Sequence, residues 1–239
     1  MARGQLRKQS RKDSSGANLT GRLIVISDPS SSASEAYRTL RTNLMYALID
    51  TPPRVMLVTS PGPTEGKSTT CANLGVTLAQ AEKRTLIVDC DLRKPTLHKV
   101  FGLRNFQGVV NVMAGEQSLR EAQQEVLPNN LKVLTVGTIP PNPAELLGSK
   151  RFADFMSLAR REFEYVLIDA PPIQLVSDAA ILATQADGTL IVLDAQRTRK
   201  SGLRQAVRSL DTVGANILGT VMNNVDASAG YYPSDYTYS

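Results

Sequence analysis

The sequence predicts an α/β domain built around a doubly wound, mostly parallel β-sheet. Six short segments are rich in branched apolar residues: VMLVTS (55–60), TLIVDCD (85–91), LKVLTV (131–136), YVLIDA (165–170), TLIVLD (189–194) and ILGTVM (217–222). These runs are continuous rather than alternating, which is typical of strands covered on both faces. Residues 67–81, 149–162 and 200–213 have helical spacing and lie between the strands. Alternating strands and helices predict the doubly wound arrangement.

A further helix is expected ahead of the first strand. Ser34 is a suitable N-cap residue, and apolar side chains follow it at helical spacing. This stripe consists of Tyr37, Leu40, Leu44 and Leu48. The helix would therefore pack with one apolar face on the domain.

Composition divides the chain into a basic arm (residues 1–20), one domain (21–226) and a terminal tail (227–239). The arm carries five basic residues before the first acid, namely Arg3, Arg7, Lys8, Arg11 and Lys12. When these five are set aside from the 27 basic residues, 22 remain against 22 acidic residues, so the domain is neutral. The arm suits an anionic surface, either membrane lipid or nucleic acid, or it is a solvated tail without a partner.

Composition also excludes several classes of protein. Hydrophobic residues make up 42% of the chain, which excludes disorder throughout. No apolar run approaches the roughly 18–20 residues that span a bilayer, and the first residues do not resemble a signal peptide, so we expect a cytoplasmic protein. The two cysteines and single histidine, His98, favour a hard cation held by oxygen over a zinc or histidine site.

A phosphate-binding loop follows the first apolar strand. Residues 60–69 read SPGPTEGKST and lead into a predicted helix, although Pro61 occupies the position of the first glycine in G-x-x-x-x-G-K-[ST]. Loop amides and the helix N-terminus would bind phosphate, Lys67 would reach the β- and γ-phosphates, and the Ser68 hydroxyl would bind magnesium. The candidate nucleotide-binding residues here are Gly62, Thr64, Glu65, Gly66, Lys67, Ser68 and Thr69.

Three carboxylates end two other predicted strands. Asp89 and Asp91 follow residues 85–88, and Asp169 follows residues 165–168. Ligands of open parallel sheets bind beyond the carboxyl ends of the strands. The pattern therefore places these acids beside the phosphate loop, where they would hold the metal of a nucleotide.

In combination, these motifs resemble those of the bacterial tyrosine kinases of capsule and exopolysaccharide synthesis, of the type that works with a separate membrane activator. The resemblance covers nearly the whole chain and rests on GKST (66–69), LIVDCDLRKP (86–95), VLIDAPP (166–172) and a tyrosine-rich end. It implies a P-loop NTPase fold of the MinD/ParA-like branch, with ATP and Mg²⁺ as ligands.

Residues 35–43, EAYRTLRTN, are similar to the family's self-association motif. Glu35, Arg38 and Arg41 recur every three residues and share a broad helix face. The resemblance implies that this face contacts a neighbouring subunit in a ring. The alternative is a solvated face with an intrahelical Glu35–Arg38 pair.

Four of the seven tyrosines lie close to the end of the chain: Tyr231, Tyr232, Tyr236 and Tyr238. Aromatic residues usually contribute to a core, but this segment has no core-forming pattern. The resemblance implies that a neighbouring subunit phosphorylates them. Because each phosphate adds about −1.5 to −2 charges, phosphorylation should weaken docking of the tail and loosen the ring. The alternative is an exposed or membrane-interface aromatic segment.

The resemblance also implies roles for the site residues. Lys67, Asp89 and Asp91 are catalytic: Asp89 deprotonates the acceptor tyrosine, while Ser68, Asp91 and Asp169 hold Mg²⁺. Asn223 lies near the adenine, with Asn224 as a substitute, and Arg93 and Lys94 face phosphate, a neighbour's tail or solvent. Implied partners are a transmembrane activator or polysaccharide co-polymerase subunit, protein tyrosine substrates and a phosphotyrosine phosphatase, with no specific nucleic acid. The activator would recruit the kinase to the inner face of the membrane.

Two other functions fit part of the sequence. A partitioning or division-site ATPase shares the branch, but its signature lysine would fall on Gly62, five residues before Lys67. A nucleotide-dependent scaffold for a membrane polymerase would use the same fold without needing kinase activity. The tyrosine-rich end favours the kinase over the ATPase.

Overall fold

The computed structural model describes residues 23–46, 52–127 and 130–226. Within these residues, seven strands form one sheet in the order β3-β4-β2-β5-β1-β6-β7. The strands are β1 (Val55–Thr59), β2 (Thr85–Asp89), β3 (Gln124–Leu127), β4 (Leu131–Leu134), β5 (Tyr165–Asp169), β6 (Gly188–Asp194) and β7 (Ile217–Asn223). Only β3 runs antiparallel to its neighbour, so the predicted mostly parallel sheet is confirmed.

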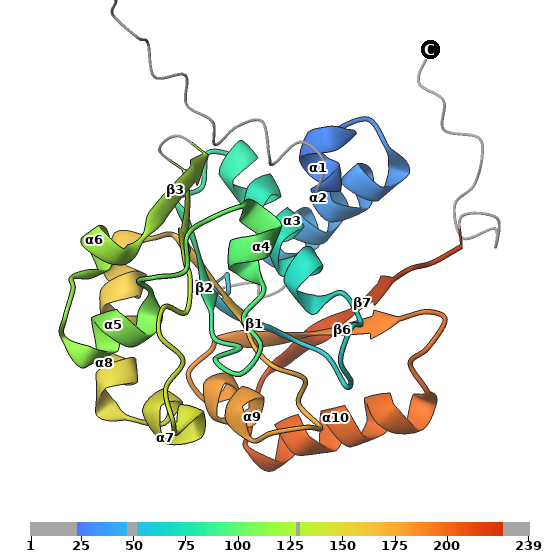
Figure 1. Cartoon of the computed structure of the whole chain (residues 1–239). Helices are drawn as coiled ribbons and strands as arrows, with labels where there is room; N and C mark the ends of the chain where they lie inside the picture. The colour runs from blue at the N-terminus through green and yellow to red at the C-terminus, as the bar shows by residue number, and fades with distance from the viewer. Residues whose placement is uncertain (1–22, 47–51, 128–129, 227–239) are drawn as a thin grey trace, which may run out of the picture.

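Helices cover both faces of this sheet (Figure 1). They are α1 (Ile24–Ser27), α2 (Ser32–Met45), α3 (Lys67–Gln80), α4 (Leu97–Phe101), α5 (Val109–Ala114), α6 (Leu119–Ala122), α7 (Pro143–Leu147), α8 (Lys150–Glu162), α9 (Asp178–Ala183) and α10 (Lys200–Thr212). Figure 1 shows α1 to α4 above the sheet and α7, α9 and α10 below it. The doubly wound class predicted from the sequence is therefore confirmed.

Two apolar cores hold the layers together. On one face, Phe152 of α8 and Leu210 of α10 pack with Leu57 of β1. On the other face, Leu74 of α3 and Leu44 of α2 pack with Val58 of the same strand. Successive side chains of β1 point alternately into the two cores, so this strand is buried on both sides. This arrangement fixes the carboxyl ends of the central strands.

The predicted strands and long helices match the observed ones within about two residues, but the start of α2 differs. Ser31, and not Ser34, is the N-cap, and its hydroxyl accepts a hydrogen bond from the Ser34 amide. Ser34 is buried, where its hydroxyl donates to the carbonyls of Ile24 and Asp28. Three of the four predicted apolar residues of the stripe join the core beside α3, and Leu48 lies outside the described residues.

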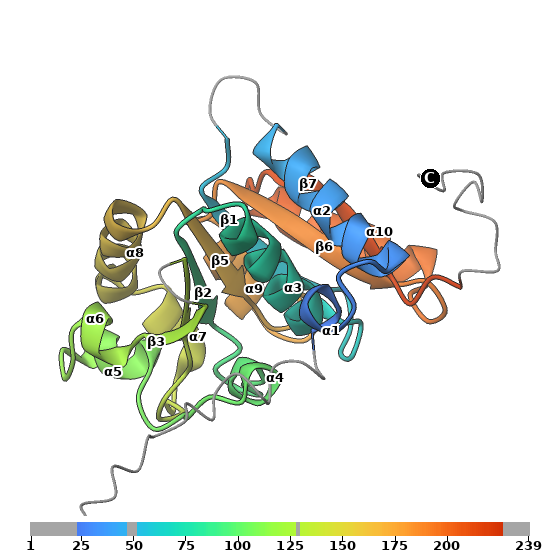
Figure 2. The same ribbon diagram turned by 90° about the horizontal axis from the view of Figure 1, so that it is seen from above.

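The sequence did not indicate α1 or β3. Seen from above, α1 and α2 lie beside α3, the helix that follows the phosphate loop (Figure 2). The basic arm (1–20) and the tail (227–239) predicted from composition lie outside the described residues. Among the described residues, no helix has the length and apolar character needed to cross a membrane.

Candidate active site

The phosphate loop joins β1 to α3 at the carboxyl edge of the sheet. Gly66, immediately before Lys67, has a φ of +93°, which favours glycine, and a side chain there would collide with Asn223. Thr64 also has a positive φ, +61°, although it is β-branched. An L-residue in this conformation is strained by about 1–2 kcal/mol. The loop conformation therefore suits glycine at position 66 but is unfavourable for threonine at position 64.

Polar contacts from distant elements hold the loop in this shape. The Glu65 carboxylate accepts hydrogen bonds from the Gly62 amide at 3.2 Å and from the Thr198 hydroxyl at 2.7 Å. The Asn223 side chain donates to the Glu65 carbonyl at 3.2 Å. Glu65 and Asn223 were predicted to contact the nucleotide, and here they contact the loop itself. Sequence inspection missed Thr198 because it lies 133 residues from Glu65.

Lys67 lies at the centre of the predicted acidic cluster. Its ammonium nitrogen is 3.0 Å from Asp91 Oδ2, 3.4 Å from Asp169 Oδ1 and 3.2 Å from Ser68 Oγ. Burial lowers the pKa of Lys67, but the carboxylates of Asp169 and Asp91 raise it by more, so the net shift is upward. The structure thus brings together the phosphate-loop lysine and all three predicted metal ligands.

One oxygen in this cluster has no partner among the described residues. Asp169 Oδ2 is buried and accepts no hydrogen bond, while Asp169 Oδ1 faces Lys67. Burial raises the pKa of Asp169, and the positive charge of Lys67 opposes this shift. A buried carboxylate oxygen beside a serine hydroxyl and a second carboxylate suits a hard cation. Ser68, Asp91 and Asp169 therefore fit Mg²⁺.

Asp89 is fully buried, as Asp169 is. Its Oδ1 accepts from the Asp91 amide at 3.2 Å, and its Oδ2 accepts from the Thr96 and Leu97 amides at 3.1 Å each. Burial and the neighbouring charge of Asp169 raise the pKa of Asp89, whereas the hydrogen bond from the Leu97 amide and the charge of Lys67 oppose the shift. Asp89 thus shapes the loop from Asp91 to Thr96 and the start of α4.

Thr96 is a site residue that the sequence analysis missed. Its hydroxyl donates a hydrogen bond of 2.9 Å to Ser68 Oγ. A hydroxyl can both donate and accept, so Thr96 could instead accept a hydrogen bond from the Ser68 hydroxyl if a cation were bound to Ser68 Oγ. A threonine in an irregular loop carries no sequence pattern by which this contact would be recognised.

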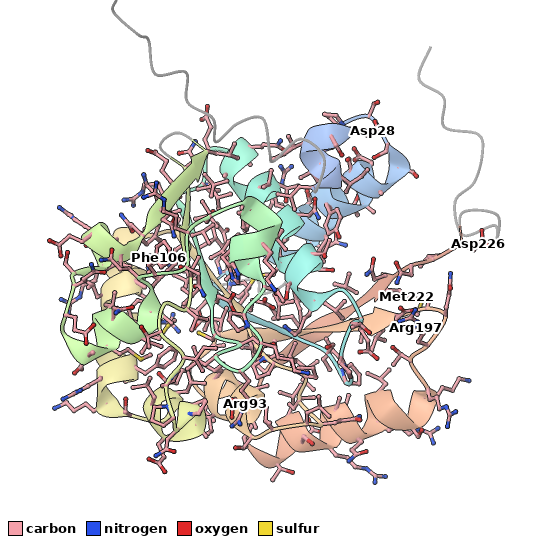
Figure 3. All side chains as sticks on the ribbon, in the orientation of Figure 1. Asp28, Arg93, Phe106, Arg197, Met222 and Asp226 are labelled. Carbon is pink, nitrogen blue, oxygen red and sulfur yellow. The ribbon has the colours of Figure 1, made fainter. Side chains whose placement is uncertain are left out.

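A cleft of about 580 Å³ opens in front of Lys67. Its lining includes Thr64, Gly66, Ser68, Thr69, Asp91, Arg93 and Lys94 from the predicted set, together with Pro63, Thr96, Val100, Pro171, Pro172, Leu175 and Val176. Arg93 forms a two-point ion pair with Asp178, with Nε to Oδ2 at 2.9 Å and Nη2 to Oδ1 at 3.1 Å. Figure 3 shows Arg93 beside α9, of which Asp178 is the first residue. The cleft is large enough for a small-molecule ligand.

The residues predicted for self-association lie on α2, away from this cleft. Arg38 pairs with Glu35 at 2.7 Å within the helix, as the alternative interpretation expected. The Arg41 guanidinium donates to the Thr77 carbonyl of α3 at 3.0 Å. Glu35 is the most open of the three, and contact with a neighbouring subunit stays a prediction.

The four predicted phosphoacceptors, Tyr231, Tyr232, Tyr236 and Tyr238, lie outside the described residues. Asn224, the predicted substitute for Asn223, donates to Asp194 Oδ2 at 2.9 Å. Hydrogen bonding to Asn224 lowers the pKa of Asp194. Asn224 therefore supports the β6–β7 edge of the sheet in this structure.

The fold and this site define a P-loop nucleotide-binding protein. A family model described as an AAA domain matches residues 62–221. The MinD septum site-determining protein of Pyrococcus horikoshii, solved with Mg-ADP, has a TM-score of 0.60 at 23% identity and covers 71% of this chain and 69% of that one. At this identity the likeness shows the fold alone, and it agrees with the predicted P-loop NTPase fold.

Relatives of higher sequence identity show to which family of P-loop proteins the chain belongs. The tyrosine-protein kinase YwqD of Bacillus subtilis is 41% identical over 221 residues, which cover 91% of this chain and 93% of that protein. The crystal structure of the chimerical protein CapA2B2 has a TM-score of 0.82 at 36% identity, with 85% of this chain and 90% of that chain covered. The chain belongs to the bacterial tyrosine-protein kinase family, which confirms the predicted enzyme class.

Replacing Thr64 with glycine should raise the free energy of unfolding by about 1 kcal/mol. Glycine adopts a positive φ without the strain of a β-branched residue, although part of the gain is offset by its greater freedom in the unfolded chain. The measurement is urea-induced unfolding of the two proteins. Thr184→Gly is the matched control, since Thr184 has an ordinary φ of −69°, and it should not be stabilised. A Thr64→Gly protein less stable than the wild type would contradict the claim that Thr64 is strained.

Proposed function

We propose that this chain transfers the γ-phosphoryl group of ATP to tyrosine hydroxyls, including its own C-terminal cluster, and thereby regulates capsular or exopolysaccharide synthesis. The observation that carries this proposal is the cluster of Lys67, Asp91 and Asp169 at the inner end of an open cleft. Phosphoryl transfer depends mainly on positioning and charge neutralisation, and this cluster supplies both. Membership of the tyrosine-protein kinase family supports tyrosine as the acceptor.

Positive charge for the phosphates comes from the loop and its helix. Lys67 would leave its carboxylate partners for the β- and γ-phosphates, where its charge stabilises the leaving group. The loop amides and the N-terminus of α3 would bind the remaining phosphate oxygens. Gly66 permits the close approach of the backbone that such contacts need. In this proposal, Glu65 and Asn223 support the loop, and Asn223 also lies near the adenine.

Ser68, Asp91 and Asp169 would hold Mg²⁺ beside these phosphates. When bound, the metal neutralises charge on the β- and γ-phosphoryl oxygens. Asp169 has the unpartnered oxygen, and Thr96 orients the Ser68 hydroxyl. The chain's own residues thus supply oxygen ligands suited to this hard cation.

For the acceptor proton, the geometry favours Asp91 over Asp89. Asp91 lines the cleft and accepts one backbone hydrogen bond, from the Lys94 amide to Oδ1 at 3.0 Å, whereas three backbone amides occupy the oxygens of Asp89. When Lys67 moves to the phosphates, Asp91 Oδ2 becomes free, and we therefore place this oxygen in contact with the tyrosine hydroxyl, whose proton it accepts as the phosphoryl group is transferred, while Oδ1 would remain for Mg²⁺. Asp89 is a positioning residue that holds the loop on which Asp91 lies. This division differs from the roles that the family resemblance implies.

The remaining parts of the proposal follow the family resemblance. Subunits would form a ring through Glu35, Arg38 and Arg41, so that each tail reaches the active site of its neighbour. A transmembrane activator or co-polymerase subunit would recruit the ring to the membrane, and a phosphotyrosine phosphatase would reverse the reaction. The open position of Glu35 on α2 is compatible with such a contact.

Incubation with ATP and Mg²⁺ should add phosphate to Tyr231, Tyr232, Tyr236 and Tyr238. Tail-peptide mass spectrometry measures this directly, and Lys67→Met should abolish it because the phosphates lose their buried positive charge. If the tail of the wild type stays unmodified, adding the activator's cytoplasmic segment decides between a missing activator and another function. ATP hydrolysis without tyrosine phosphorylation in that mixture would contradict the proposal.

Asp91→Asn should lower kcat for tyrosine phosphorylation by about 100-fold or more, because the amide cannot accept the proton. Asp89→Asn should instead lower the free energy of unfolding by about 1–3 kcal/mol, because an amide cannot accept all three backbone hydrogen bonds. Kinase assays and urea unfolding of both variants separate the two roles. A stable but inactive Asp89→Asn protein beside a fully active Asp91→Asn protein would reverse the assignment.

A further inference from the structure

The cleft in front of Lys67 has two chemically different ends. Its inner end is formed by polar groups, including Lys67, Ser68, Asp91 and Thr96. The rest of the lining includes the apolar residues Val100, Pro171, Pro172, Leu175 and Val176, which we call the outer, apolar end, and it also includes the exposed cations Arg93 and Lys94. A ligand that fits both ends has one polar tip and an apolar body.

Leu175 is the most exposed apolar side chain of this outer end, with 61% of its surface accessible. It lies between β5 and α9, in the segment that follows Asp169. Val100 of α4 and Val176 are each half-buried on the same cleft. An apolar group that covers this exposed leucine removes apolar surface from water, which favours binding of that group.

The two walls of the outer end are joined to each other. Arg93, from the loop after β2, is fixed by its two-point ion pair with Asp178, at the start of α9. The Asp178 side chain is fully buried, whereas that of Arg93 is 43% exposed, so the pair joins the two loops at the surface of the cleft. The apolar walls are therefore held at a set spacing before any ligand arrives, which lowers the entropic cost of binding.

The apolar end lies on one side of the phosphate loop. It is formed by segments after β2 and β5, and both of these strands lie on the same side of β1. The contacts of Thr198 and Asn223 with the loop come from segments at β6 and β7, on the other side of β1. Figure 3 shows Arg93 well apart from Met222, the neighbour of Asn223. A second ligand can therefore occupy the apolar end while the nucleotide base lies toward β7.

We propose that Val100, Leu175 and Val176 bind the aromatic ring of the acceptor tyrosine and that Leu175 is a specificity-determining residue. This inference rests on the proposed function. The ring would cover Leu175 while its hydroxyl reaches Asp91 at the inner end, in keeping with the two-sided character of tyrosine. A serine or threonine acceptor has no ring and would leave the apolar walls exposed. The cleft thus selects tyrosine by its size and its apolar surface.

The test uses the full-length chain and a synthetic acceptor peptide, GYYPSDYTYS, which corresponds to residues 230–239. Peptide phosphorylation is followed by mass spectrometry, which separates it from modification of the enzyme. Leu175→Ser should raise KM for the peptide about tenfold, the effect expected for losing contact between a leucine and an aromatic ring. It should leave kcat and KM for ATP unchanged. Leu175→Phe should keep KM for the peptide within about twofold of the wild type.

Ile139→Ser is the matched control, because Ile139 is 55% exposed and does not line the cleft. It should leave KM for both substrates unchanged. An unchanged KM for the peptide in Leu175→Ser would overturn the acceptor site alone, and an equal rise in KM for ATP would assign the apolar end to the nucleotide instead. A wild-type protein that transfers no phosphate to tyrosine, with the activator segment present, would overturn the proposed function as well.

Discussion

The rest of the site depends on one interaction, the buried ion pairs of the Lys67 ammonium group with Asp91 and Asp169. Three charged groups meet where water has little access, and each is costly to bury alone. The lysine begins α3, one aspartate ends β5, and the other follows β2. The parallel sheet brings these chain positions together, and the two apolar cores hold the sheet in place. The fold therefore serves to keep these charges within reach of one another.

Other polar contacts extend this constraint outward. Asp89 holds the loop after β2 by accepting three backbone hydrogen bonds, and Glu65 holds the phosphate loop through Gly62 and Thr198. Arg93 and Asp178 then join the loops on either side of the cleft. The Glu65–Thr198 and Arg93–Asp178 contacts link segments that follow different strands, so the cleft is shaped by the topology of the sheet. A site built in this way can position two ligands on opposite sides of Lys67.

Much of the fold could be predicted because its signals are local. Continuous apolar runs and helical spacing indicated six of the strands and the long helices, and the motif around Lys67 indicated the phosphate loop. Short elements such as α1 and β3 lack such patterns. The partners of Asp89, Thr96 and Glu65 also could not be predicted, because they are backbone amides and hydroxyls whose proximity depends on loop conformation. The predicted N-cap of α2, Ser34, was wrong because several serines lie close together there and each is a suitable N-cap residue.

The most direct test of the central claim is the affinity of the nucleotide-free protein for Mn²⁺, measured by electron paramagnetic resonance in the wild type and in Lys67→Met. In the wild type, the ammonium competes with a divalent cation for Asp91 and Asp169. Removing that positive charge should therefore tighten Mn²⁺ binding, by about tenfold or more, even though the same variant is expected to lose phosphoryl transfer. Unchanged or weaker Mn²⁺ binding by a folded Lys67→Met protein would contradict the claim that these carboxylates are shared between the lysine and the metal.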